Sequence, residues 1–179
     1  MGRGSAYGVG ENDFATLRLA WFPDPAWITG YGGLDHSHFP FRLQGREGPP
    51  LHVLMIEDDP AIAEMYRLQF EHDGYRVSVA TTGDLGVSAM SGSAPDVVLL
   101  DLLLPDRSGF EVLTVLNERF PNHPPVVILS NYGEPSMIDK GMSLGAVEYL
   151  VKSRVTPAEI SGQIPLWVER GRRGGKADS

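Results

Sequence analysis

The chain has no cysteine and only three lysines among its 179 residues. The lack of cysteine excludes disulfide bonds, thiolate catalysis and cysteine-ligated zinc, and it is compatible with the reducing cytoplasm, where we expect the protein to act. No apolar run approaches the roughly 18 residues of a membrane-spanning helix, and the N-terminus lacks the features of a secretory signal. We therefore expect no membrane partner. Because lysines are so few, a single lysine at a defined place in the fold is easy to notice.

Acidic residues outnumber basic ones, and the formal net charge is −8. This balance argues against a general nucleic-acid surface, so we expect protein partners and no direct DNA binding. The basic segment "ERGRRGGK" (169–176) is more often a solvated chain end than a nucleic-acid contact.

The first 50 residues differ from the rest in composition and in hydrophobic pattern. They hold eight of the sixteen aromatic residues and no lysine, and they show no sustained period of a strand or helix. "FATLRLAWF" (14–22) fits a short strand as well as a helical turn, and "HSH" (36–38) fits an exposed loop better than a metal site. Residues 1–50 are therefore expected to be an irregular extension. It is either disordered or non-native, or else an arm that packs on a partner.

From Leu51 onward, apolar runs alternate with amphipathic segments. Asp59 and Pro60 have the residue types of a helix start, Gly74 those of a helix end, and Pro165 is expected to kink or end the last helix. The expected strands are 51–56, 75–80, 96–101, 125–130 and 146–151, and the expected helices are 59–74, 83–92, 108–120, 135–145 and one starting at 156.

This alternation predicts an α/β fold with a five-stranded parallel sheet, right-handed crossovers and helices on both faces. The folded domain is expected over 51–168, followed by a flexible basic tail over 169–179. In such open sheets, ligands bind beyond the carboxyl ends of the strands.

Polar residues stand at four of those strand ends. Glu57 and Asp58 follow the first strand, Asp101 ends the third, Ser130 ends the fourth and Lys152 follows the fifth. Carboxylate oxygens with water suit Mg²⁺, which also relieves the repulsion among the acids. A hydroxyl and an ammonium beside a metal can bind phosphoryl oxygens, and an aspartate can accept the phosphoryl group as a nucleophile.

These residues carry a resemblance to the receiver domain of bacterial two-component response regulators. The matching stretches are "VLMIEDDP", "PDVVLLDLLLPDRSG", "VVILS" and "GAVEYLVKS", within residues 51–164. The intervals between Asp58, Asp101, Ser130 and Lys152 are 43, 29 and 22 residues, close to those of the family. The resemblance implies a doubly wound, flavodoxin-like sheet with strand order 2-1-3-4-5.

The resemblance also implies roles for individual residues. Asp101 is the expected phosphoacceptor, and Lys152 is expected to pair with it or with its phosphate. Mg²⁺ is expected to bind Asp58, Asp101 and the backbone carbonyl of Leu103 directly, with Glu57 acting through water. Ser130 and Tyr149 are the expected switch residues. Asp59 is expected to cap the next helix rather than to bind the ion.

The resemblance further implies the partners and the activity. We expect a stand-alone phosphoacceptor, with at most autophosphatase activity, that is phosphorylated by a histidine kinase or a phosphotransfer protein. Phosphorylation would switch a face that binds a downstream protein or forms a homodimer. That face comprises the helix at 135–145, the strand at 146–151 and the helix starting at 156. Two other hypotheses remain: a phosphorylation-independent binding module of the same fold, and a metal-dependent phosphohydrolase.

Two positions depart from the usual family pattern, and two bulky residues flank the site. Ser153 stands where proline commonly follows the lysine, so the Lys152–Ser153 bond is either trans or a strained cis bond. Asn131 replaces a small residue beside the phosphoryl pocket. Leu103 and Tyr132 are bulky and flank the expected path of attacking water, which predicts slow loss of the phosphoryl group.

Overall fold

The computed structural model describes residues 49–174. The predictions for residues 1–48, including Phe14–Phe22 and the histidines at 36 and 38, lie outside the described residues. The same holds for the last five residues of the predicted tail.

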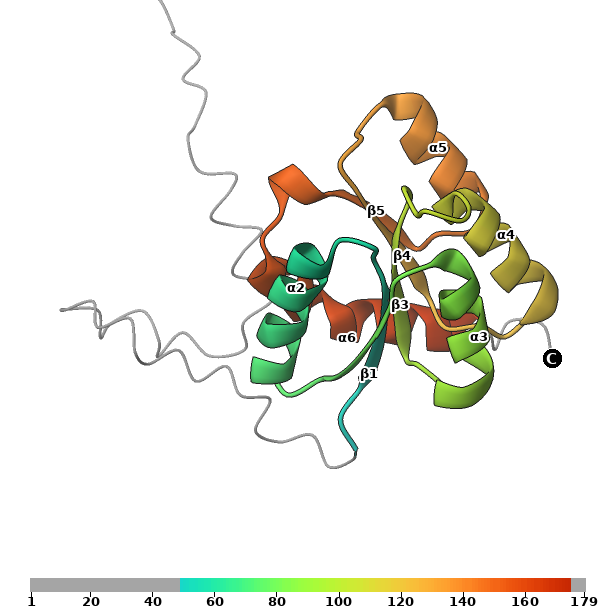
Figure 1. Cartoon of the computed structure of the whole chain (residues 1–179). Coiled ribbons are helices and arrows are strands. Elements are labelled where there is room, and N and C mark those ends of the chain that lie inside the picture. The colour runs from blue at the N-terminus through green and yellow to red at the C-terminus, as the bar shows by residue number, and fades with distance from the viewer. Residues whose placement is uncertain (1–48, 175–179) are drawn as a thin grey trace, which may run out of the picture. The chain divides into compact units, whose positions relative to one another are not determined.

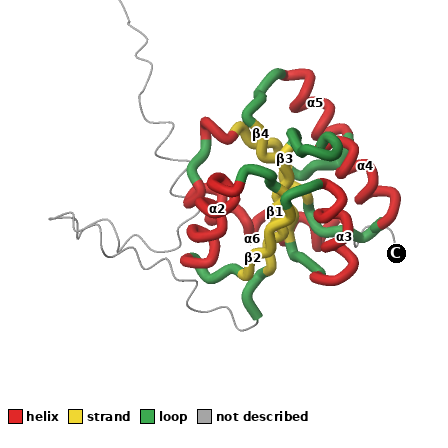
Figure 2. The backbone as a smooth tube through the Cα atoms, in the orientation of Figure 1, coloured by secondary structure: helices red, strands yellow, loops and turns green. Residues whose placement is uncertain are grey.

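The five strands form one parallel sheet in the order β2-β1-β3-β4-β5, as the sequence predicted. Figure 2 shows them together in the middle of the domain, between the helices. The hydrophobic runs of β1, β3 and β4 are buried along their whole length, because helices cover both faces of the sheet. The strands are β1 (His52–Ile56), β2 (Arg76–Ala80), β3 (Val97–Asp101), β4 (Val126–Ser130) and β5 (Glu148–Val151).

The helices form two layers around this sheet. Figure 1 shows α2 and α6 on one side and α3, α4 and α5 on the other. Side chains of α2 and α6 share one buried cluster with alternate residues of the strands, and the other strand residues pack against the opposite layer. The helices are α2 (Pro60–His72), α3 (Gly83–Ser93), α4 (Gly109–Arg119), α5 (Pro135–Ser143) and α6 (Pro157–Gly174), with a short 3₁₀ turn, η2 (Lys152–Arg154).

Helix starts follow the residue types in the sequence. Asp59 caps α2, with its carboxylate accepting hydrogen bonds from the backbone N–H groups of Ala61 and Ile62, as predicted. Ser108 and Glu111 form a reciprocal capping box at the start of α4. Both caps fix where the chain leaves the carboxyl edge of the sheet, so they define the walls of the region that carries the polar residues.

The last helix differs from its prediction. It continues through Pro165 to Gly174, six residues beyond the expected end of the domain. Proline lacks the N–H that would bond the carbonyl four residues earlier, which is that of Ser161. The Tyr75 hydroxyl donates to this carbonyl instead, at 2.9 Å. The helix therefore continues past the proline with the Ser161 carbonyl still hydrogen-bonded. Beyond it, Arg170 and Arg172 form ion pairs with Glu148 and Asp96.

Within residues 49–174, no helix is both long enough and apolar enough to span a membrane.

Candidate functional site

Three carboxylates meet at the carboxyl edge of the sheet. Glu57 follows β1 and is buried, Asp58 beside it is exposed, and Asp101 ends β3 and is buried. One oxygen from each lies within 4.8 Å of the others. Segments 43 residues apart in the chain thus bring their acids together, as the sequence predicted.

Lys152 lies against two of these acids. Its Nζ is 2.6 Å from Glu57 Oε2 and 3.0 Å from Asp101 Oδ2, and all three side chains are almost fully buried. Burial raises the pKa of Glu57, against the lowering effect of Lys152. Burial alone would lower the pKa of Lys152, but the hydrogen bonds and charges of Glu57 and Asp101 raise it above its usual value. The lysine is therefore a cation held between two acids.

The orientation of Asp101 is fixed by its neighbours. The backbone N–H of Leu102 donates to Asp101 Oδ1 at 2.7 Å, while Oδ2 faces Lys152. Gly109 is required close by, because a Cβ there would lie 2.3 Å from the Asp101 carbonyl oxygen. The start of α4 therefore packs directly against the backbone of Asp101.

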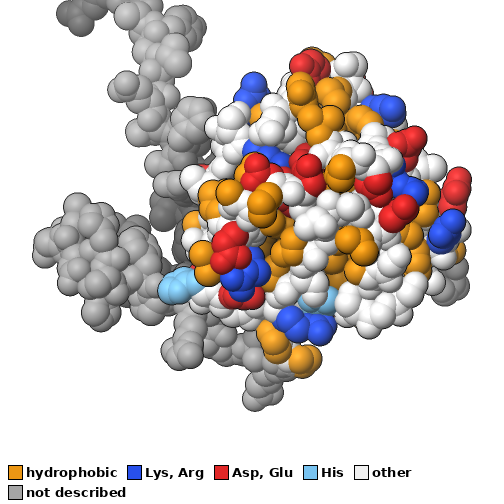
Figure 3. Space-filling model, in the orientation of Figure 1, with side chains coloured by type: hydrophobic (Ala, Val, Ile, Leu, Met, Phe, Trp, Pro, Cys, Tyr) orange, Lys and Arg blue, Asp and Glu red, His pale blue; other side chains and the backbone are white. Residues whose placement is uncertain are grey.

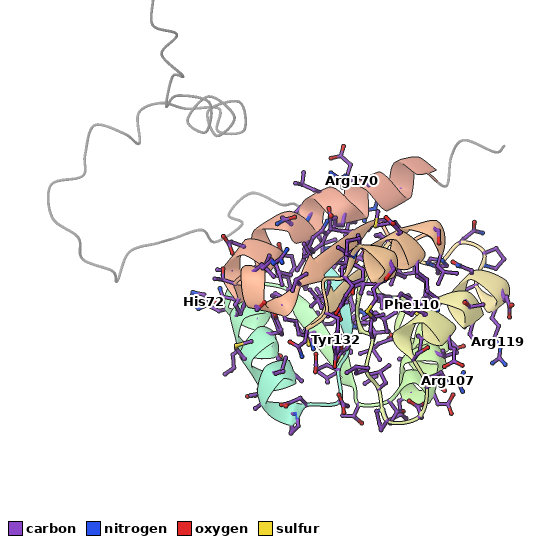
Figure 4. The ribbon with its side chains drawn as sticks, turned by 90° about the horizontal axis from the view of Figure 1, so that it is seen from above. His72, Arg107, Phe110, Arg119, Tyr132 and Arg170 are labelled. Atoms are coloured by element: carbon purple, nitrogen blue, oxygen red, sulfur yellow. The ribbon has the colours of Figure 1, made fainter. Side chains whose placement is uncertain are left out.

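Ser130 and Tyr149 are linked through one residue. Ser130 Oγ accepts the N–H of Tyr132 at 3.1 Å, and the Tyr149 hydroxyl donates to the carbonyl of Tyr132 at 2.8 Å. Both side chains are buried, and Figure 4 shows Tyr132 in the middle of this end of the molecule. The two expected switch residues thus bond the backbone of the same residue in the β4–α5 loop, one at its N–H and the other at its carbonyl. The sequence did not indicate this role for Tyr132.

The other residues singled out in the sequence beside the site are exposed. Leu103 and Tyr132 are 55% and 42% exposed, and Asn131 is also exposed. No peptide bond within residues 49–174 is cis, so the Lys152–Ser153 bond is trans, one of the two alternatives drawn from the sequence. Lys152 reaches both acids with that bond trans, as the first residue of η2.

The sequence did not show that Glu57 forms an ion pair with Lys152. Ninety-five residues separate the two, and no spacing rule chooses which carboxylate the lysine contacts. Strands β3 and β4 lie between β1 and β5 in the sheet, so the strand order does not pair the two residues either. Lys152 reaches Glu57 from η2, beyond the end of β5.

The donor set fits a hard divalent cation. All three grouped ligands are carboxylates, with neither histidine nor cysteine among them, and oxygen donors are those that Mg²⁺ prefers. The exposure of Asp58 leaves this side of the group open to water, which Mg²⁺ largely retains. Lys152 neutralises one of the three negative charges, so a net negative charge remains.

The fold and these residues define a receiver domain. Residues 53–164 match the family described as "Response regulator receiver domain", which is more than half of the chain. The chain belongs to this family of two-component signalling proteins.

Named relatives and solved structures agree with that family. The chain is 32% identical to the "Probable transcriptional regulatory protein TcrX" of Mycobacterium tuberculosis, over 62% of this chain and 47% of TcrX. It is 33% identical to the "DNA-binding response regulator MtrA" of Mycolicibacterium smegmatis, over 66% and 50%. The Francisella response regulator 1452 receiver domain superposes with a TM-score of 0.63 at 27% identity, over 67% of this chain and 98% of that one. The chain spans about half the length of the curated relatives it matches.

These relatives correct the expectation about partners. We expected no direct DNA binding, yet the matched relatives are transcriptional regulators, and one is named as DNA-binding. The expectation rested on the net charge of this chain, which carries no information about the other half of such relatives. Over the face drawn in Figure 3, the acidic and basic side chains are interspersed, as is common for a solvated surface. The stand-alone status remains a prediction.

Proposed function

We propose that the chain is a phosphoacceptor receiver in which Asp101 takes a phosphoryl group from a histidine kinase or a phosphotransfer protein in the cytoplasm. The observation that carries this proposal is the contact of Lys152 Nζ with Asp101 Oδ2, at 3.0 Å, inside a group of three acids. A structural ion pair needs one acid, whereas phosphoryl transfer needs an acceptor, an ammonium and oxygen ligands for a cation.

In this proposal, an oxygen of Asp101 forms the new P–O bond as the P–N bond of the donor's phosphohistidine breaks, and the histidine nitrogen keeps the electron pair. Lys152 stabilises the negative charge on the phosphoryl oxygens, since it already lies beside the acceptor. The N–H of Leu102 holds the other Asp101 oxygen, so the carboxylate is oriented before the reaction.

Glu57, Asp58, Asp101 and the carbonyl of Leu103 are the groups that would hold Mg²⁺, with Glu57 acting through water. The ion would supply charge neutralisation at the transferred group. Because Lys152 compensates only part of the acidic charge, the pocket retains attraction for a divalent cation.

Ser130 and Tyr149 would transmit the change. Ser130 Oγ now bonds the N–H of Tyr132, and turning toward a phosphoryl oxygen would release that bond. The same loop residue holds the Tyr149 hydroxyl, so the side chain of Tyr149 would follow. The surface formed by α5, β5 and α6 would then change shape.

The test is incubation with acetyl phosphate and Mg²⁺ followed by intact-mass measurement. We expect a gain of one phosphoryl group, about 80 Da, that disappears in Asp101→Asn and when Mg²⁺ is chelated. An unchanged mass of the folded wild-type protein would favour the phosphorylation-independent module. Turnover of acetyl phosphate without a stable adduct would favour the phosphohydrolase.

A further inference from the structure

The loop that follows the expected phosphoacceptor runs from Leu102 to Ser108, and we call it the acceptor loop. It carries Leu103, whose carbonyl is expected to bind the cation. Leu103 is 55% exposed, so packing does little to fix this residue. Within the loop, Leu103 forms an antiparallel bridge to Ser108. The N–H of Gly109, the first residue of α4, donates to the Leu102 carbonyl at 2.9 Å.

A carboxylate ties this loop to a different element. Asp106 Oδ1 accepts the backbone N–H of Gly83, and Oδ2 accepts that of Asp84, both at 2.8 Å. These two residues are the first of α3, where helical N–H groups lack partners within the helix. The N–H group of Asp84 is the main cause of the lowered pKa of Asp106, and that of Gly83 adds to it. The helix end therefore prefers the charged form of this side chain.

Arg107 adds a second tie between the same segments. It forms an ion pair with Asp84, and its aliphatic stem lies against Gly83. A Cβ at position 83 would lie 2.7 Å from Arg107 Cγ, so glycine allows this close approach. Figure 4 shows Arg107 beside the α3 and α4 ribbons. The acceptor loop is thus attached to α3 through two consecutive residues.

We propose that Asp106 is a positioning residue of the phosphorylation site. By holding the acceptor loop against the N-terminus of α3, it keeps the Leu103 backbone in place to complete the oxygen ligands of Glu57, Asp58 and Asp101. This inference rests on the proposed function. The new element is a role in cation binding for Asp106, a residue that would contact neither the cation nor the phosphoryl group.

Two measurements test the proposal in the whole chain: calorimetric titration with MgCl₂ and the rate of phosphorylation by acetyl phosphate. We expect Asp106→Ala to weaken Mg²⁺ binding about tenfold, the lower end of the effect seen when outer supports of metal ligands are removed. The phosphorylation rate should fall at low Mg²⁺ and recover at saturating Mg²⁺, because the acceptor and Lys152 remain. Asp106→Asn keeps one acceptor oxygen and should give an intermediate affinity. It also serves as the test variant if Asp106→Ala does not fold.

Thr82→Ala is the matched control. It removes another hydrogen bond at the same end of α3, from the Leu85 N–H to Thr82 Oγ1 at 3.1 Å, but leaves the acceptor loop untouched. We expect it to lower the urea midpoint while its Mg²⁺ affinity stays at the wild-type value.

The proposal is overturned if Asp106→Ala lowers the urea midpoint as Thr82→Ala does and binds Mg²⁺ with wild-type affinity. That outcome leaves the proposed function standing. If the wild-type chain itself binds no Mg²⁺ and gains no phosphoryl group, the proposed function fails, and this inference fails with it.

Discussion

At the scale of single residues, the contacts of Lys152 determine the charge of the site. The ammonium lies between Glu57 and Asp101, which are buried acids from two different strands. A buried charge that loses its partner is far more costly than an exposed one, because water cannot replace the lost contact. The stability of the domain and the chemistry of the site therefore depend on the same ion pairs.

We expect Lys152→Met to lower the free energy of unfolding by about 3 kcal/mol in the absence of Mg²⁺, since two buried acids then face each other uncompensated. Added Mg²⁺ should restore part of the loss by neutralising them. The measurement is urea unfolding with and without MgCl₂. Lys140→Met is the control: Lys140 is exposed and lies 4.5 Å from the Phe110 ring centroid, a contact that contributes about 0.5–1 kcal/mol. Equal losses in the two variants would contradict the expected importance of the buried pairs.

Leu103 and Tyr132 permit a second prediction at this scale, on the lifetime of the phosphorylated protein. Both side chains are bulky and partly exposed, and we expect them to hinder attacking water without bonding it. Leu103→Asn combined with Tyr132→Glu should hydrolyse its aspartyl phosphate faster, by roughly tenfold, which corresponds to about 1.4 kcal/mol in the barrier. The decay is followed by intact mass after acetyl phosphate is removed. A lifetime in the double variant as long as that of the wild type would reject this role.

At the scale of elements, α6 continues through Pro165 because of Tyr75. The Tyr75 hydroxyl bonds the Ser161 carbonyl that the proline leaves free. Tyr75→Phe should therefore cost about 1–3 kcal/mol, the penalty of an unsatisfied buried carbonyl. In a Pro165→Ala background, the restored N–H at residue 165 can bond that carbonyl, so Tyr75→Phe should cost at least about 1 kcal/mol less. Urea unfolding of the four proteins measures this coupling, and additive effects would refute the explanation.

The elements themselves were largely predictable. All five strands and the first four helices lie within a few residues of their predicted bounds, and the fifth helix starts where predicted, because buried runs, Asp59 with Pro60, and Gly74 are local signals. The end of α6 was not predictable, since the group that satisfies the Ser161 carbonyl is 86 residues away in the chain. β5 begins at Glu148 rather than Ala146, because Ala146 still bonds the Gly141 carbonyl of the preceding helix.

The sequence predicted which residues form the site, but not which of them contact one another. The positions of Glu57, Asp58, Asp101 and Lys152 at strand ends predicted that they would meet, because parallel strands bring their carboxyl ends to one edge. The Glu57–Lys152 pair and the bonds of Asp106 to α3 depend on side-chain rotamers and loop shape, which leave no periodic signal.

At the scale of the whole molecule, the two edges of the sheet differ in what they bury. The carboxyl edge holds the acids and Lys152, whereas the amino edge holds His52 at the start of β1. The His52 ring bonds the Ser93 carbonyl at 3.0 Å and the Ser78 hydroxyl at 2.8 Å. A carbonyl only accepts, so Nδ1 carries the proton, and in the neutral ring Nε2 accepts from Ser78.

We expect this arrangement to make the stability of the domain depend on pH. Burial lowers the pKa of His52, and nearby Arg76 lowers it further, while the Ser93 carbonyl and Asp96 oppose the shift. As the pH falls below the ordinary value of 6.5, the unfolded chain binds a proton at this residue before the folded chain does. The free energy of unfolding should therefore decline from that pH down to the folded-state pKa.

Urea unfolding between about pH 7.5 and about pH 5.5, in wild type and in His52→Gln, measures this contribution. The variant should show a smaller decline over this range, because glutamine does not titrate. Glu57 has a raised pKa and also affects the profile, but it is present in both proteins and cancels in their difference. Parallel profiles would mean that the folded chain accommodates a charged His52, with Ser78 turned to accept from Nε2. In that case burial at the amino edge of the sheet would not make the domain sensitive to acid.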